Sequence, residues 1–137
     1  MSIRSLIGME DSSTGHITFI YCHNDGYFEG VGKTLVTSWT DPEKIRKLLA
    51  LGDISILGNV IGRKHRFDRH HYSPRAKKDY TLAYARDRGD EGCEARTVAT
   101  RQAFRKEGER YNAEFLYLSQ NGKWLGSRGG AFTKVNF

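Results

Sequence analysis

Alternating hydrophobic and polar positions predict several β-strands along the chain. Residues 16–22 alternate Ile17, Phe19 and Tyr21 with Thr18 and Ile20, and they are rich in β-branched and aromatic side chains. Residues 2–9 are predicted to form the preceding strand, because the polar turn EDSSTG separates the two segments. Shorter strands are predicted over residues 80–84, 94–98, 111–119, 123–127 and 131–137, with a turn or strand over 53–58. Asn121-Gly122 predicts a tight hairpin between two of them.

Helical spacing of apolar residues predicts one clear helix, over about residues 41–51. Thr40 or Asp41 is expected to cap its N-terminus, Pro42 suits its first turn, and Gly52 ends it. Its apolar stripe consists of Ile45, Leu48 and Leu49. Weaker patterns predict shorter helical segments over 30–39 and 100–108, and a polar loop over 86–92. The expected fold is therefore a single α+β domain, residues 1–137, with an antiparallel sheet and a basic loop or insertion at about 59–79.

Length and composition are typical of one globular domain. The chain has 137 residues, of which 38% are hydrophobic and 28% are charged. No apolar run approaches the ~20 residues that a membrane span needs, and the N-terminus does not resemble a secretory signal. The two cysteines, Cys22 and Cys93, form no CxxC motif and are expected to be buried thiols in a reducing compartment. These features predict a cytoplasmic protein with no membrane partner.

Positive charge is concentrated in one segment, residues 63–78, which we call the basic segment. It holds seven basic residues against Asp68 alone, a net charge of +6, which equals the net charge of the whole chain. A neutral domain with one basic arm is expected to meet an acidic partner through that arm.

The basic segment has two interpretations, a solvated loop without a partner or a contact surface. As a contact surface it would bind nucleic acid or an acidic host protein surface. Its aromatic residues would stack on bases and its arginines would bind phosphates. No helix-turn-helix, zinc-finger or RNA-recognition signature accompanies it, so sequence-specific binding is not expected. The candidate contact residues are Arg63, Lys64, Arg66, Phe67, Arg69, Tyr72, Arg75, Lys77 and Lys78.

Gly32-Lys33-Thr34 resembles the end of a phosphate-binding P-loop, but the spacing argues against nucleotide hydrolysis. Gly26 precedes Gly32 by one residue too many for the motif, and nothing else predicts a parallel α/β domain. A weaker hypothesis is a small-anion site, a sponge for a nucleotide signal, without hydrolysis. Its candidate residues are Gly30, Gly32, Lys33, Arg86 and Arg88.

Histidine and cysteine residues give little evidence for a metal site or for catalysis. His65, His70 and His71 lie close in sequence, but no second cluster completes a zinc site, so they are expected to add hydrogen-bond donors to the basic segment. His23 and Asp25 offer a possible acid–base pair, yet Cys22 and His23 are expected to point to opposite faces of a strand. No metal and no cofactor is predicted, and an enzyme using His23 and Asp25 is the second alternative function.

Several motifs resemble a family of small, mostly uncharacterised proteins of tailed bacteriophages and prophages. The similar stretches are YCHNDGY at 21–27, VGKTL at 31–35, TDPEK at 40–44, ALGDIS at 50–55, RDRG at 86–89 and, more weakly, the ending Tyr117 with NGKW at 121–124. The chain departs from the pattern at Asn24, where a tryptophan is expected. The resemblance places Gly32-Lys33-Thr34 at the start of a helix of this family. It implies no general activity, and so no catalytic residue.

A phage setting favours a protein that acts by binding. The primary hypothesis is a non-enzymatic phage or prophage accessory protein that inhibits a host nucleic-acid-handling or anti-phage defence system in the bacterial cytoplasm. A decoy that occupies an acidic or nucleic-acid-binding groove is one form of it.

Overall fold

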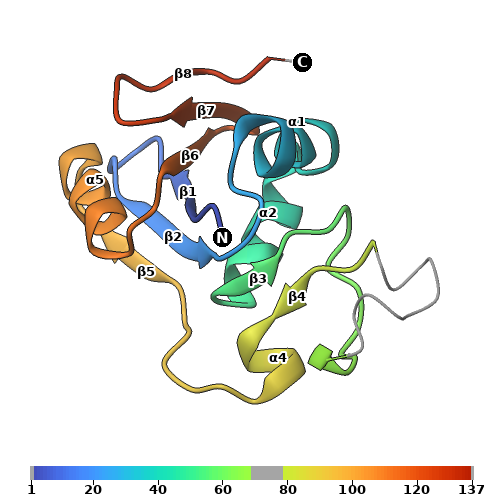
Figure 1. Ribbon diagram of the computed structural model, residues 1–137. Helices are drawn as coiled ribbons and strands as arrows, with labels where there is room; N and C mark the ends of the chain where they lie inside the picture. Colours follow the sequence, from blue (N-terminus) through green and yellow to red (C-terminus); the bar gives the residue numbers. More distant parts are fainter. Residues whose placement is uncertain (1, 69–78, 137) are drawn as a thin grey trace.

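A computed structural model describes residues 2–68 and 79–136 as a mixed sheet with helices on both faces (Figure 1). The strands are β1 (Ser5–Glu10), β2 (Ile17–Cys22), β3 (Ile54–Ile56), β4 (Leu82–Ala83), β5 (Arg96–Val98), β6 (Phe115–Gln120), β7 (Lys123–Ser127) and β8 (Thr133–Lys134). The helical elements are a π-helical turn η1 (Phe28–Gly32), α1 (Lys33–Ser38), α2 (Pro42–Ala50), α4 (Tyr84–Arg88) and α5 (Arg101–Arg110). The α+β class is therefore confirmed.

The sheet runs in the order β4-β3-β2-β1-β6-β7-β8, and β5 also pairs with β2. The prediction of a purely antiparallel sheet is wrong, because β1 pairs with β6 in parallel and β2 pairs with β3 in parallel. The chain between β2 and β3 forms η1, α1 and α2, which supply the crossover that a parallel pair requires. Hairpin pairs stay antiparallel: β1 with β2 and β6 with β7.

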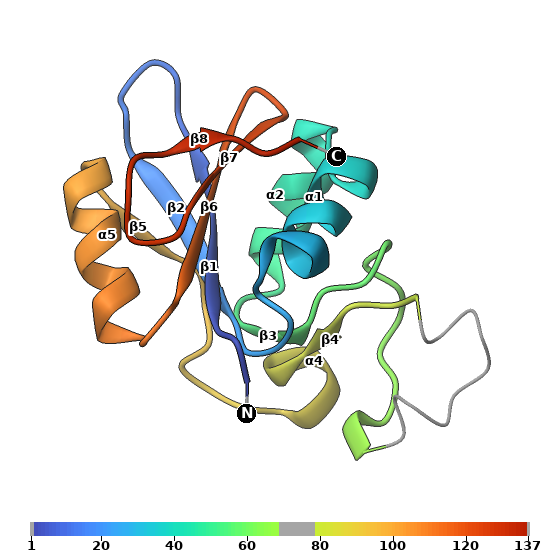
Figure 2. The same ribbon diagram turned by 45° about the horizontal axis from the view of Figure 1, so that its top comes forward.

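Figure 2 shows the sheet nearly edge-on, with α1 and α2 against one face and α5 against the other. Alternate residues of β1 and β2 divide between the two layers. Ile7 and Ile20 pack under α1 and α2 with Trp39 and Leu48, whereas Leu6 belongs to the second core, under α5. Phe19 meets Phe104 of α5 edge-on in that second core, with ring centroids 5.5 Å apart.

Local signals correctly predicted α2 and the β6–β7 hairpin. Asp41 is the N-cap of α2, where its carboxylate accepts the N–H of Glu43, and Pro42 occupies the first turn. Asn121 and Gly122 both have positive φ, 52° and 83°, as the two-residue turn between β6 and β7 requires.

Several element boundaries differ from the prediction, and two of these differences lie next to the candidate site. The strand expected over 80–84 shortens to Leu82–Ala83, and α4 replaces the start of the loop expected over 86–92. Gly89, with φ 80°, ends α4 in the left-handed conformation. Within the described residues, no helix has the length and apolar character needed to cross a membrane.

Candidate functional site

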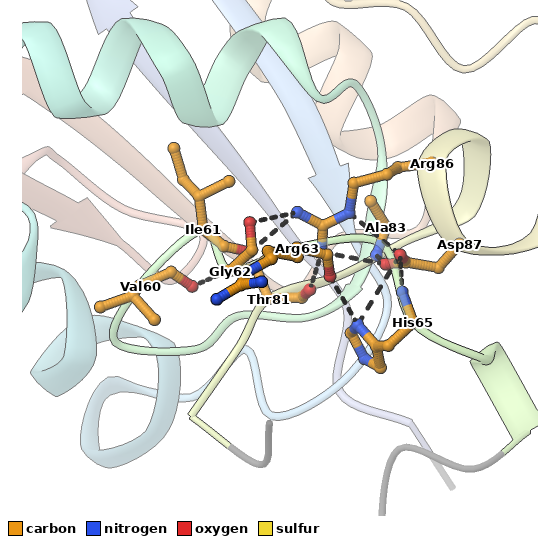
Figure 3. Close-up of polar contacts among 9 residues, drawn as sticks. All are labelled: Val60, Ile61, Gly62, Arg63, His65, Thr81, Ala83, Arg86 and Asp87. Carbon is orange, nitrogen blue, oxygen red and sulfur yellow. Dashed lines mark hydrogen bonds and ion pairs between the residues drawn. The ribbon is translucent and has the colours of Figure 1, made fainter. Parts of the chain in front are cut away.

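A buried ion pair anchors the N-terminal part of the basic segment to α4 (Figure 3). The carboxylate of Asp87 accepts the Nε–H of Arg86 at 3.0 Å and an Nη2–H of Arg86 at 3.1 Å. The same carboxylate accepts the backbone N–H groups of His65 at 3.1 Å and Ala83 at 2.8 Å. The Asp87 side chain has no exposed surface, so all of its charge is balanced inside the protein.

Burial alone would raise the pKa of the Asp87 carboxyl group. The hydrogen bonds from Arg86 and from the backbone of Ala83 and His65 outweigh burial and lower that pKa below its ordinary value. Asp87 is therefore an ionised structural residue and not a general acid.

Arg86 uses its remaining donors on backbone carbonyl groups. Nη1–H groups reach Ile61 O at 2.9 Å and Gly62 O at 3.2 Å, and an Nη2–H reaches Thr81 O at 2.6 Å. These contacts connect the residues before Arg63 to Thr81, which immediately precedes β4 (Figure 3). The hypothesis that Arg86 binds a small anion thus finds no support in its surroundings, because the guanidinium already has its partners.

His65 is buried although it belongs to the basic segment. Its side chain is only 2% exposed, and its Nδ1 lies 3.0 Å from Arg63 O and 3.7 Å from the carboxylate of Asp87. Its ring meets Tyr80 edge-on, with centroids 5.8 Å apart. The ring of His65 therefore makes its contacts inside the protein, including one to the backbone of Arg63 in the basic segment itself. His70 and His71 lie outside the described residues.

Three cationic side chains are exposed on the anchored, N-terminal part of the basic segment. Arg63, Lys64 and Arg66 are all exposed, and Arg66 pairs with the exposed Asp68 at 3.1 Å. Among the described residues, Arg63 and Lys64 form no side-chain ion pair. An exposed pair such as Arg66–Asp68 contributes little and remains available to another anion. The other predicted contact residues, Arg69, Tyr72, Arg75, Lys77 and Lys78, lie outside the described residues.

Phe67 and Tyr84 form a half-buried stacked pair beside these cations. Their ring centroids are 5.6 Å apart, with an interplanar angle of 27°. The guanidinium of Arg88 lies over both rings, 4.6 Å from the Phe67 centroid and 4.9 Å from that of Tyr84, and pairs with Asp90 at 2.8 Å. Phe67 is thus held in place by the protein. Tyr84, unlike Phe67, was not among the predicted contact residues.

A second aromatic pair, also absent from the prediction, joins β2 to the end of α5. Tyr21 stacks on Tyr111 with centroids 5.6 Å apart, and the guanidinium of Arg96 lies 5.0 Å from the Tyr111 centroid. Arg96 in turn pairs with Asp53 at 2.7 Å. The only sequence signal for this pair was the alternation of Ile17, Phe19 and Tyr21 along β2, because Tyr111 and Arg96 come from distant segments.

The glycine-rich turn at Gly30 and Gly32 is explained by packing. The N–H groups of Gly30 and Gly32 donate to Tyr27 O at 3.0 and 3.4 Å, so these backbone donors already have acceptors. A Cβ at Gly30 would collide with the carbonyl oxygen of Asp25, and a Cβ at Gly32 would lie 3.2 Å from the ring of Tyr117. Gly32 directly precedes α1, which begins at Lys33.

The surroundings of this turn are acidic. A cavity of about 160 Å³ beside Gly30 has Asp25 and Glu29 as its charged lining residues, and Lys33 is exposed and does not line it. Arg86 and Arg88 belong to α4, which lies apart from α1 in both views (Figures 1 and 2). The residues of the predicted anion site are therefore not gathered around one cavity.

His23 and Asp25 do not form an acid–base pair in this structure. The Nδ1 of His23 lies 2.6 Å from the hydroxyl of Tyr21, whereas Asp25 is exposed at a positive φ of 59°. Burial, followed by the charge of Arg4, lowers the pKa of His23, and burial raises the pKa of Tyr21 to about 12. The lowered pKa of His23 and the raised pKa of Tyr21 both favour a neutral histidine that accepts a hydrogen bond from a neutral tyrosine.

Cys22 faces away from this histidine, as the alternation along β2 predicted. Its thiol is buried in the core under α1 and α2, and burial raises its pKa to about 12. A thiol in this state is a poor nucleophile. Within residues 2–68 and 79–136, no group of three or more His, Cys, Asp or Glu side chains is arranged to hold a metal ion.

A wider groove lies elsewhere, between α2 and the β1–β2 turn. It has a volume of about 660 Å³, and its lining includes Met9, Thr18, Thr97 and Arg46. Glu10, at its edge, is already bound by Arg101 at 2.8 Å and by Gln120 at 2.7 Å. None of the predicted site residues lines this groove.

In comparisons with known proteins, no family model, no curated protein and no solved structure matches this chain.

Proposed function

We propose that this chain binds nucleic acid through the basic segment and catalyses no reaction. We further propose that it does so as a phage or prophage accessory protein that interferes with a host nucleic-acid-handling or anti-phage defence system in the bacterial cytoplasm. The observation that carries the proposal is the exposure of Arg63, Lys64 and Arg66 on a stretch of chain that buried hydrogen bonds hold in place.

Anchoring matters because it lowers the entropic cost of binding. Gly62 and Ile61 are tied to Arg86, and the backbone of His65 is tied to Asp87, so the stretch that carries these cations is positioned before a ligand arrives. A preorganised cationic surface binds phosphates with less ordering cost than a flexible arm. The same cations also suit an acidic protein surface, which is the alternative partner.

A titration of fluorescein-labelled single-stranded DNA, followed by anisotropy over a salt series, tests the proposal. Each phosphate contact on a single strand contributes about 0.7 to the slope of log affinity against log salt. We expect the triple variant Arg63→Gln, Lys64→Gln, Arg66→Gln to bind more weakly and to lower that slope by about 2.

The matched control removes three positive charges elsewhere. Lys47, Lys106 and Lys123 are exposed lysines outside the basic segment, and their triple replacement by Gln changes the net charge equally. Equal losses in both variants would mean non-specific attraction to a basic protein and would contradict the proposal. An absence of binding by the natural chain at low salt would also contradict it, and would direct the search to an acidic protein or a small nucleotide.

A further inference from the structure

Two stacked aromatic pairs lie close to Asp53 in the folded chain, and one of them includes Phe67 of the basic segment. One is Phe67 with Tyr84, and the other is Tyr21 with Tyr111. All four side chains are half-exposed. Tyr84 and Tyr111 come from segments that the sequence analysis did not connect with binding.

Asp53 brings the two pairs together. The backbone N–H of Tyr84 donates to Asp53 O at 3.3 Å, and the backbone N–H of Tyr21 donates to the Asp53 carboxylate at 2.9 Å. One residue therefore contacts the backbone of a tyrosine from each pair. The two pairs are neighbours on the folded chain although α4 and β2 are distant in sequence.

Each aromatic pair also carries an arginine whose charge is already balanced. Arg88 lies over Phe67 and Tyr84 and pairs with Asp90, while Arg96 lies over Tyr111 and pairs with Asp53. Guanidinium planes, like aromatic rings, offer flat surfaces on which bases stack. Since both charges are balanced by aspartates, this surface suits base stacking better than phosphate binding.

We propose that Phe67, Tyr84, Tyr21 and Tyr111 form a stacking surface for the bases of single-stranded nucleic acid, whose phosphates contact Arg63, Lys64 and Arg66. This inference rests on the proposed function and deepens it, because it assigns bases and phosphates to different residues. Stacking of this kind is tolerant of sequence, in agreement with the lack of a sequence-reading motif.

The hydrogen bond between Tyr21 and His23 adds a donor at the border of this surface. Because Nδ1 of the neutral His23 ring accepts from the Tyr21 hydroxyl, its Nε2 carries the proton. Arg4, whose charge acts on both side chains, lies beside them. In this proposal, these groups supply polar contacts to a base or a sugar at the edge of the stacking surface.

The test separates stacking from charge by the salt dependence of binding. Tyr84→Leu with Tyr111→Leu removes one ring from each pair while it keeps apolar volume. We expect the affinity for a labelled oligothymidylate to fall about five- to 100-fold, with the salt slope unchanged. Tyr84→Phe with Tyr111→Phe keeps the rings and is expected to retain binding. Tyr27→Leu, at a tyrosine that is 40% exposed elsewhere, is the matched control.

Two outcomes overturn the inference while leaving the proposed function intact. One is unchanged affinity in the Leu variant when the triple charge variant loses binding. The other is an equal loss of affinity in the Phe variant, although that variant keeps all four rings. Failure of the natural chain to bind the oligonucleotide at all would overturn the proposed function, and the stacking surface with it.

A second measurement uses the natural chain and does not depend on how the variants fold. An oligonucleotide that carries 5-iodouracil is cross-linked by light, and the modified residues are mapped by mass spectrometry. Cross-links to Tyr84, Tyr21, Tyr111 or Phe67 are expected. Cross-links confined to other residues would overturn the inference.

Discussion

Arg86 and Asp87 are adjacent in sequence and form an ion pair that is buried on the carboxylate side, with Nε and Oδ1 3.0 Å apart. Between them they contact the backbone of five other residues, which lie at the start of the basic segment, just before it, and in or next to β4: Ile61, Gly62, His65, Thr81 and Ala83. The pair is therefore the main polar link between α4 and the part of the chain that presents the exposed cations.

Replacing Asp87 by Asn is expected to destabilise the protein by about 3 kcal/mol. The substitution leaves the guanidinium of Arg86 without its charged partner, and removing one member of a buried pair is costly. Urea unfolding followed by tryptophan fluorescence measures the change. Asp90→Asn, which breaks the exposed pair with Arg88, is the control and should cost less than about 1 kcal/mol. Equal costs for the two variants would contradict the structural role of Asp87.

The stability difference between the natural chain and Asp87→Asn is expected to depend on pH. The pKa of Asp87 is lowered in the folded state, so its ionised form stabilises the fold above the unfolded pKa of about 3.9. That contribution is lost as the pH falls through the lower, folded pKa. Urea unfolding at neutral pH and at successively more acidic pH should show the difference shrinking only below about pH 4. A difference that stays constant into strong acid would mean that the charge of Asp87 contributes nothing.

Gly30→Ala is expected to destabilise the protein by about 1–3 kcal/mol without any anion being involved. The added Cβ would collide with the carbonyl oxygen of Asp25, which is itself fixed by the N–H of Val31 at 2.8 Å. Thermal unfolding checks this. Gly130→Ala, where an added Cβ meets open space, should change stability by no more than about 0.5 kcal/mol. If Gly30→Ala left the stability unchanged, the packing explanation would fail and the anion hypothesis for this turn would be restored.

The two cysteines are expected to react with iodoacetamide at very different rates. Cys22 is fully buried and its pKa is raised to about 12 by burial, whereas Cys93 is half-exposed. Because only an accessible thiolate reacts quickly, mass spectrometry of the native protein should show a single adduct, at Cys93. In denaturant both residues should react. Rapid labelling of Cys22 in the native state would mean that the core under α1 and α2 opens readily.

Much of the local structure could be predicted because the signals act over a few residues. The cap at Asp41, the proline at the first turn and the apolar stripe defined α2 within a residue at each end. The positive-φ pair Asn121-Gly122 defined the β6–β7 hairpin for the same reason. The end of the 80–84 strand was predicted wrongly. The chain turns into α4 at Tyr84, whose N–H donates to Asp53 O, and the Asp87 carboxylate accepts the N–H of the distant His65.

The sequence by itself determined which segment carries the excess charge, which segments form strands and where the best helix lies. Only the tertiary structure decided that β1 pairs in parallel with β6, because that pairing joins residues more than a hundred positions apart. It also decided that Arg86 is engaged in the interior while Arg63 is exposed, although the two are the same residue type. The physical reason is that capping, turn geometry and periodicity are local properties. Whether a charge is buried or a ring finds a stacking partner depends on contacts between distant segments.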